Sequence, residues 1–488
     1  MKKLNFKIIF QIIGIFTIVE AIAIFLCVIA TVYYNENYKA ILYASGITGS
    51  IGIVLYSLFK NAPKDIGKRE GYIIVTFAWL FFSIFGALPY VISGSMPNFA
   101  DAFFESMSGF TTTGASILSD IEALPKDILL WRSLTQWLGG MGIIVLSLAI
   151  IPLLGIGGMQ LYAAEVPGPT KDKIHPKVKD TAQRLYLIYV SFTLLETLLL
   201  MIGGMSFFDA LNHSFTTMAT GGFSTYNTSL VHVSPYIQYV VIAFMFLAGV
   251  NFTLSYFAFH GKFERVWNNE EFRSYTLIII LFTCIVACII GYQQYVANHS
   301  IVGIEKIIRD SLFQVVSLCT TTGFASANYL VWPAAAIMLC FMLLFFGGSA
   351  GSTGGGMKVV RIVILAKHSY LELKRLVHPS AIIPVRLNNV TVPEKVITNV
   401  LAFIVIYIIV FVMGVLLMSF LHYDFETSLG AVASAIGNVG PGIGKVGPYD
   451  NYGFICNSGK YLLSFLMLCG RLELFTVLIL FSPAFWRK

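Results

Sequence analysis

The chain has 488 residues, of which 57% are hydrophobic and 12% are charged, and its formal net charge is +7. Soluble domains carry roughly 25% charged residues, so this composition excludes an ordinary soluble protein and predicts one embedded in lipid. The seven cysteines and eight histidines are scattered and form no CxxC pair, which argues against a zinc site or a disulfide framework.

Ten apolar segments follow one another along the chain, most of them near the roughly 20 residues that a membrane-spanning helix needs. They are residues 8–33, 40–59, 71–94, 128–154, 185–204, 236–259, 275–297, 332–366, 396–421 and 460–482. The segment 332–366 is broken by a glycine-rich stretch. This order predicts an all-α polytopic membrane protein.

The basic residues gather in alternate connections between these segments. If the N-terminus is cytoplasmic, 24 of the 32 Lys and Arg residues fall in the inside segments 1–7, 60–70, 156–184, 260–274, 358–395 and 487–488. This is the asymmetry of the positive-inside rule, and it predicts that both termini are cytoplasmic. The positive charge is therefore explained by topology, and no nucleic-acid partner is expected.

Four shorter, half-polar segments repeat in register, and each contains a key glycine: Gly114, Gly222, Gly323 and Gly440. Thirteen residues before the glycine stand Asp101, Asp209, Asp310 and Thr427. Six residues before it stand Ser108, Thr216, Ser317 and Ser434, and two residues before it Thr112, Thr220, Thr321 and Asn438. The register predicts four tandem units, at 71–184, 185–274, 275–393 and 394–488, after a two-helix N-terminal extension at 1–70.

Each unit is expected to run as a long helix, a short re-entrant helix, a Thr/Gly pore loop and a returning helix. The Asp or Thr at the start of each short helix is a good N-cap, and we favour that role over attraction of cations. Non-helical backbone at membrane depth is tolerated where it is buried or lines water. Because four such loops in a ring can replace the hydration shell of a monovalent cation, the pattern predicts a pseudo-fourfold central pore.

The loop sequences TTTGA, ATGGF, TTTGF and IGNVG resemble those of the Trk/Ktr/HKT superfamily of potassium transporters. The two extra N-terminal helices, the chain length and SAIGNVGPG resemble its bacterial TrkH branch. The resemblance implies potassium uptake across the bacterial cytoplasmic (inner) membrane, with no organic cofactor in this chain and no enzyme activity. It implies potassium binding in a selectivity filter made of Thr111, Thr112, Thr113, Gly114, Ala219, Thr220, Gly221, Gly222, Thr320, Thr321, Thr322, Gly323, Gly437, Asn438, Val439 and Gly440.

The glycine-rich stretch FFGGSAGSTGGGMK interrupts the third returning segment. The apolar run before it would span only about 21 Å as a helix, less than the roughly 30 Å of a bilayer core, so the stretch should lie at membrane depth. Glycines at similar distances suggest interruptions at 139–142, 249–251 and 470–471, with close helix packing as the alternative at the first two. The resemblance implies an intramembrane gating loop at 347–356, with a gate made of Gly347, Gly348, Ser349, Gly351, Ser352, Gly354, Gly355, Gly356 and Arg471.

Arg471 lies near the middle of an apolar segment, where a charge is costly and usually functional. Glu473, two residues on, lies on another helix face and is a poor partner for it, and the gating loop or a subunit contact is the alternative partner. We expect Arg471 to point into the pore. The alternative is a pair with a carboxylate or with carbonyl groups of a neighbouring helix.

A secondary transporter for another cation or a small organic solute is the alternative function, since broken helices at the membrane midplane also occur there. Parallel fourfold repeats with almost no buried charge favour the potassium pathway. The sequence 442–447 matches GxGxxG but has no strand before it, which argues against a nucleotide site in this chain. The resemblance further implies a homodimer on a cytosolic TrkA-like nucleotide-binding ring, with basic segments 171–184 and 358–386 as candidate contacts.

Overall fold

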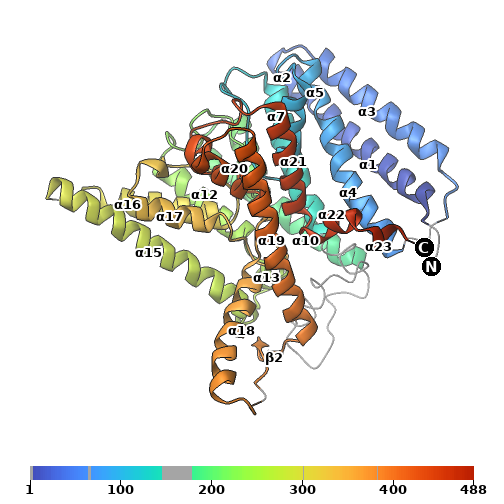
Figure 1. Cartoon of the computed structure of the whole chain (residues 1–488). Coiled ribbons are helices and arrows are strands. Elements are labelled where there is room, and N and C mark those ends of the chain that lie inside the picture. Colours follow the sequence, from blue (N-terminus) through green and yellow to red (C-terminus); the bar gives the residue numbers. More distant parts are fainter. Residues whose placement is uncertain (1–3, 64–66, 146–177, 300–301, 382, 488) are drawn as a thin grey trace.

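The computed structural model describes residues 4–63, 67–145, 178–299, 302–381 and 383–487 (Figure 1). These ranges are helical apart from loops and one small hairpin of β1 (Arg386–Leu387) and β2 (Val390–Thr391). Six of their helices are long and apolar enough to cross a membrane, and eight spans result if each of two bent pairs counts as one. The predicted all-α polytopic membrane fold is confirmed.

The N-terminal extension is a helical hairpin at one edge of the molecule (Figure 1). It consists of α1 (Phe6–Leu26), α2 (Val28–Tyr34) and α3 (Lys39–Leu58). A Cβ on Gly14 would lie 3.0 Å from the Gly52 carbonyl oxygen, so α1 and α3 touch backbone to backbone. Such contact between small residues is the usual basis of helix association in lipid.

Four short helices alternate with long ones in the rest of the chain. The short helices are α6 (Phe99–Phe110), α11 (Phe207–Met218), α16 (Ile304–Cys319) and α20 (Phe425–Gly437). The helices that lead to them are α4 (Lys68–Gly86) with α5 (Leu88–Ile92), α10 (Val178–Ile202), α15 (Glu270–Asn298) and α19 (Glu394–Phe420). With 12 to 16 residues, the short helices reach at most about 24 Å and do not cross a bilayer core.

The returning helices differ from one unit to the next. They are α7 (Lys126–Val145), α12 (Pro235–Ala248) with α13 (Phe252–Phe259), α17 (Ala334–Leu343) with α18 (Val359–Val377), and α21 (Asn457–Arg471) with α22 (Phe475–Leu478). The second and fourth bend by 108° and 111° at their breaks. The remaining short elements are α14 (Phe263–Trp267), α23 (Pro483–Trp486) and the 3-10 turns η2 (Tyr329–Val331), η3 (Gly444–Val446) and η4 (Ile479–Phe481).

The interruption expected in the first returning helix is wrong, because α7 runs unbroken through Gly139, Gly140 and Gly142. These glycines serve close packing instead: a Cβ on Gly139 would lie 2.0 Å from the Phe110 carbonyl oxygen. Residues 146–154 of the predicted segment 128–154 lie outside the described residues.

The expected N-caps of the short helices are also wrong. Asn98, Ser206 and Asp424 cap α6, α11 and α20, each accepting a hydrogen bond from a main-chain N–H of the first turn. The helix α16 begins after Gly303 and has no side-chain cap. Asp101, Asp209 and Thr427 therefore lie inside the first turn and Asp310 deeper in its helix, free for other contacts.

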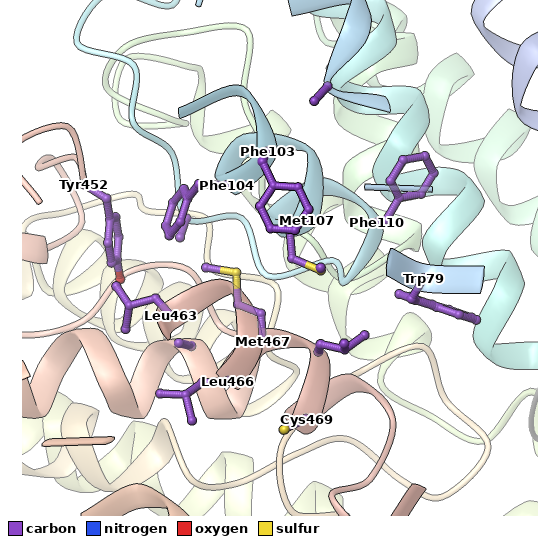
Figure 2. Close-up of a cluster of buried hydrophobic side chains, with 14 of the residues drawn as sticks. Trp79, Phe103, Phe104, Met107, Phe110, Tyr452, Leu463, Leu466, Met467 and Cys469 are labelled. Carbon is purple, nitrogen blue, oxygen red and sulfur yellow. The ribbon is translucent and has the colours of Figure 1, made fainter. Parts of the chain in front are cut away.

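A large apolar cluster joins the first unit to the last. Phe104 and Met107 of α6 face Leu463 and Met467 of α21, and the Tyr452 ring lies 5.5 Å from that of Phe104 (Figure 2). Burying side chains of this size contributes about 1.5–3 kcal/mol each in a soluble core, whereas in lipid the gain comes from close packing. The cluster closes the four units into a ring.

The two ends of the chain lie close together (Figure 1). Phe485 of α23 packs in one apolar cluster with Ile8 and Ile9 of α1. Both ends thus lie at the same end of the molecule, as the charge pattern requires.

Candidate functional site

The four Thr/Gly loops share one backbone conformation; we call them L1 (111–114), L2 (219–222), L3 (320–323) and L4 (437–440). The residue two before the key glycine is left-handed in every loop: Thr112, Thr220, Thr321 and Asn438 have φ of 51°, 54°, 58° and 53°. A left-handed conformation is strained for β-branched threonine, at about 1–3 kcal/mol, and such strain gathers at functional sites.

Each loop ends its short helix with a Schellman motif. The N–H one residue before the key glycine donates to the carbonyl six residues before it. The four bonds are Thr113 to Ser108, Gly221 to Thr216, Thr322 to Ser317 and Val439 to Ser434, at 2.8 to 3.1 Å. The four loops therefore leave their short helices with the same backbone geometry.

The key glycines hold the loops in a closed ring. A Cβ on Gly114 would lie 2.0 Å from the Gly221 carbonyl oxygen of L2, and one on Gly222 would lie 2.0 Å from the Thr322 oxygen of L3. The next contacts are Gly323 with the Val439 oxygen of L4, at 1.9 Å, and Gly440 with the Thr113 oxygen of L1, at 2.8 Å. Each glycine thus meets the carbonyl of the next loop, and the fourth meets the first.

Most carbonyl oxygens of the ring are unpaired. In residues 111–113, 219–221, 320–322 and 437–439, only those of Ala219 and Gly221 accept a hydrogen bond from the described part of the chain. Buried carbonyls are almost always paired, so this gathering of free oxygens is unusual. Oxygens in such a ring are suited to a cation that has shed its water.

Two aspartates of the repeat accept hydrogen bonds that join their short helices to the chain after the loop. Asp209 accepts from the Thr225 hydroxyl at 2.8 Å, and Asp310 accepts from the Ser326 hydroxyl at 3.1 Å. Both hydroxyls stand three residues after the key glycine. Asp101 instead pairs with Lys460 of α21, at 2.5 Å.

Thr225→Val should lower stability by about 1–2 kcal/mol, because it removes a hydrogen bond to a carboxylate. Melting of the purified protein in detergent should show a drop of a few degrees. Thr398→Val is a matched control, since its hydroxyl bonds only to the Glu394 carbonyl on an exposed helix turn. Equal melting temperatures for the two variants would show that the hydrogen bond between Asp209 and Thr225 does not stabilise the protein.

The predicted gating loop lies against the ring. Gly355 N–H donates to the Thr321 hydroxyl of L3 at 2.7 Å, and the Thr353 hydroxyl donates to the Met218 carbonyl beside L2 at 3.0 Å. A Cβ on Gly355 would lie 2.7 Å from the Gly437 oxygen of L4. The loop therefore contacts three of the four units directly.

Arg471 joins this loop to the first unit. Its guanidinium donates to the carbonyls of Thr353, at 2.6 Å, and of Gly139 in α7, at 2.9 Å, and the residue is 2% exposed. Both partners are carbonyl groups, one in the glycine-rich loop and one in α7, as the alternative of carbonyl pairing predicts, and the orientation of Arg471 into the pore stays a prediction. The Arg471 charge is neutralised by no carboxylate in the described chain.

Glu473 turns away from Arg471, as its spacing predicts. It pairs with Arg361 of α18 at 2.5 Å, and that guanidinium lies 4.0 Å from the Phe403 ring. Lys358, just before α18, donates to the Gly354 carbonyl at 2.6 Å. The exit of the loop is thus fixed by cations on α18.

Sequence reasoning missed three buried polar residues around L1 and L2. Arg132 pairs with Glu105 at 2.6 Å and donates to the Ser224 carbonyl, while Gln136 binds L2. The available signal was polarity: Arg132 and Gln136 stand four residues apart, on one face of an apolar segment.

The chain matches the TrkH family of cation transport proteins over residues 37–488. It is 40% identical to the Trk system potassium uptake protein TrkH of Escherichia coli K12 over 492 residues, covering 99% of this chain and all of that one. The TrkH protein of Halomonas elongata is 38% identical, over 94% of this chain and 95% of its own. The crystal structure of the potassium transporter TrkH from Vibrio parahaemolyticus superposes with a TM-score of 0.90 at 34% identity, covering 99% of this chain and 100% of that one.

Proposed function

Because the chain belongs to the TrkH family of cation transport proteins, we propose that it takes up potassium across the bacterial cytoplasmic membrane through a pore whose filter is L1–L4. It is a transport protein rather than an enzyme, as its family is. Relatives that match its full length are named for potassium uptake.

The observation that carries the proposal is the closed ring of loops with free carbonyls. The four key glycines have φ between 74° and 98°, and each abuts the carbonyl of the next loop. Such oxygens would replace the hydration shell of potassium, and the units at 71–184, 185–274, 275–393 and 394–488 would each supply one loop.

The gate of this pore would be the loop 347–356 together with Arg471. The loop supports this role because it contacts L2, L3 and L4 from one side and is fixed to α7 through Arg471. A buried guanidinium at this place would raise the energy of a cation that passes it.

Partners and orientation follow from the same family and from charge. The relatives are named as members of a Trk system, which supports further components beside this chain, and the proposed ones are the TrkA-like ring and the second copy that the family resemblance implies. The helix α18 and the β1–β2 hairpin extend beyond the helices around them and carry Lys374, Arg375 and Arg386, which suit contact with such a ring (Figure 1). Basic residues on this side support a cytoplasmic location for it and for both termini.

Purified protein in liposomes tests the function through its reversal potential. With potassium and sodium gradients opposed, the reversal potential should lie near the potassium equilibrium potential. A value near the sodium potential, or no cation current alongside uptake of an organic solute, would contradict the proposal and favour a secondary transporter. An added pH gradient that shifts the potential would identify a co-transported proton.

A further inference from the structure

One returning helix follows one filter loop along two helical turns. On α7 of the first unit, Gly140 packs on L2, where its Cβ would lie 2.9 Å from the Ala219 Cα. One turn earlier, Gln136 bonds to the residues on either side of Gly222. One further turn earlier, Arg132 donates to the Ser224 carbonyl at 2.9 Å. The first unit therefore supports the loop of the second.

Gln136 binds the main chain on both sides of the key glycine. Its Nε2 donates to the Gly221 carbonyl at 2.7 Å, and its Oε1 accepts from the Phe223 N–H at 3.1 Å. The residue is fully buried, and this orientation of the amide satisfies a donor and an acceptor at once. The two bonds fix the peptide groups that flank Gly222.

Position 221 is a glycine because Gln136 occupies the space that a side chain there would need. Its φ lies outside the left-handed region, so the backbone there is open to any residue. A Cβ on Gly221 would lie 2.4 Å from Gln136 Cδ, where two atoms cannot both stand. The same position in the other loops is filled by side chains: Thr113, Thr322 and Val439.

L1 and L3 hold this position by a hydrogen bond within the loop. In L1 and L3 the threonines one and three residues before the glycine bond to each other, Thr111 with Thr113 and Thr320 with Thr322, both at 2.8 Å. L2 has Ala219 and Gly221 there and cannot form this pair. Three residues before the glycines 249, 347 and 470, the matching places to Gln136 in the other returning segments are apolar: Phe246, Leu344 and Met467.

We propose that Gln136 is a positioning residue for potassium selectivity, whose amide takes the place of the side chain missing at Gly221. The inference rests on the proposed function, since it gives L2 a role in a filter. The Gly221 carbonyl is the one that meets Gly114 in the ring, so Gln136 also sets the position and field of one filter oxygen.

The first test is Gln136→Met, which keeps the volume but removes both hydrogen bonds. The potassium-to-sodium permeability ratio from reversal potentials in liposomes should fall by about tenfold, the effect of one buried hydrogen bond. Ser133→Ala is the control, because its buried hydroxyl bonds only to the Leu129 carbonyl within α7; its ratio should equal that of the wild type.

The second test transfers the side chain from the helix to the loop. Gly221→Thr alone should lower the ratio, because the threonine collides with Gln136. The double variant Gln136→Ala, Gly221→Thr gives L2 a β-branched side chain at this position, as Thr113, Thr322 and Val439 give the other loops, and should recover most of the lost selectivity. This double variant also carries the test if Gln136→Met fails to fold in a detergent melt.

Three outcomes overturn the inference, and they differ in what they mean for the proposed filter. A wild-type ratio in Gln136→Met, beside a lowered ratio in Gly323→Ser, removes the role of Gln136 and leaves the filter standing. If the permeability ratio of the double variant is as low as the two single changes together predict, the Gln136 amide does not take the place of a side chain at position 221. Wild-type ratios in Gln136→Met and Gly323→Ser alike would refute the proposed filter itself.

Discussion

Replacing Gly323 by serine should lower the potassium-to-sodium permeability ratio by about tenfold or more. Gly323 has φ of 83°, and its Cβ would lie 1.9 Å from the Val439 carbonyl oxygen and 2.8 Å from Pro441 Cδ. Serine there adds about 1–3 kcal/mol of backbone strain and displaces a carbonyl of L4. Since about 1.4 kcal/mol is a factor of ten, even part of this strain is visible in an ion ratio.

Gly94→Ser separates strain from filter geometry. Gly94 has φ of 76°, yet no described atom lies within 4 Å of its Cβ position. This variant should lose stability in a detergent melt while keeping the wild-type ion ratio. If Gly323→Ser kept that ratio too, L3 would not be part of a selectivity filter.

The fourfold register could be predicted because the same residue types recur at fixed distances from each key glycine. A left-handed turn needs glycine at its end and tolerates few residues two places before it, so Gly114 and its three counterparts mark the loops. The break before α18 could be predicted as well, because the run before it is too short to cross a bilayer.

The helix starts could not be predicted from the repeat alone. The repeat marks Asp209, but Ser206, three residues earlier, is the cap, and Asp209 instead accepts from Thr225. A carboxylate near a helix start suits both roles, and only the packing of the next segment decides. The same limit applies to Gly139, since glycine is compatible with a break and with close helix packing.

The support of L2 by α7 was beyond the sequence because it joins residues 85 apart. A glutamine in an apolar segment indicates that it has a buried polar partner but does not identify that partner. The sequence shows Gly221 directly before the key glycine and gives no reason for a second glycine there. Only its distance from Gln136 shows that one of the two glycines is there to make room.

The two residues that flank the proposed gating loop lie close enough together for the loop to be deleted. Phe346 and Met357 on either side of it pair as a β-bridge, and Met357 N–H donates to the Phe345 carbonyl at 3.1 Å. Bridged residues lie about 5 Å apart and bonded neighbours about 3.8 Å, so joining them requires a small shift. The ring contacts among L1–L4 involve none of the deleted residues.

Deleting residues 347–356 should raise potassium leak through the closed pore by about tenfold or more while leaving the ion ratio near that of the wild type. The loop lies against L2, L3 and L4 of the proposed filter, and each ~1.4 kcal/mol taken from a barrier raises flux tenfold. Tracer uptake of rubidium into liposomes that hold the chain alone measures this leak. Arg471→Met in the full-length chain should give a smaller rise, because the loop is still present although it loses the Arg471 charge and the two hydrogen bonds that join it to α7. A deletion variant as tight as the wild type would show that the stretch packs beneath the filter without closing it.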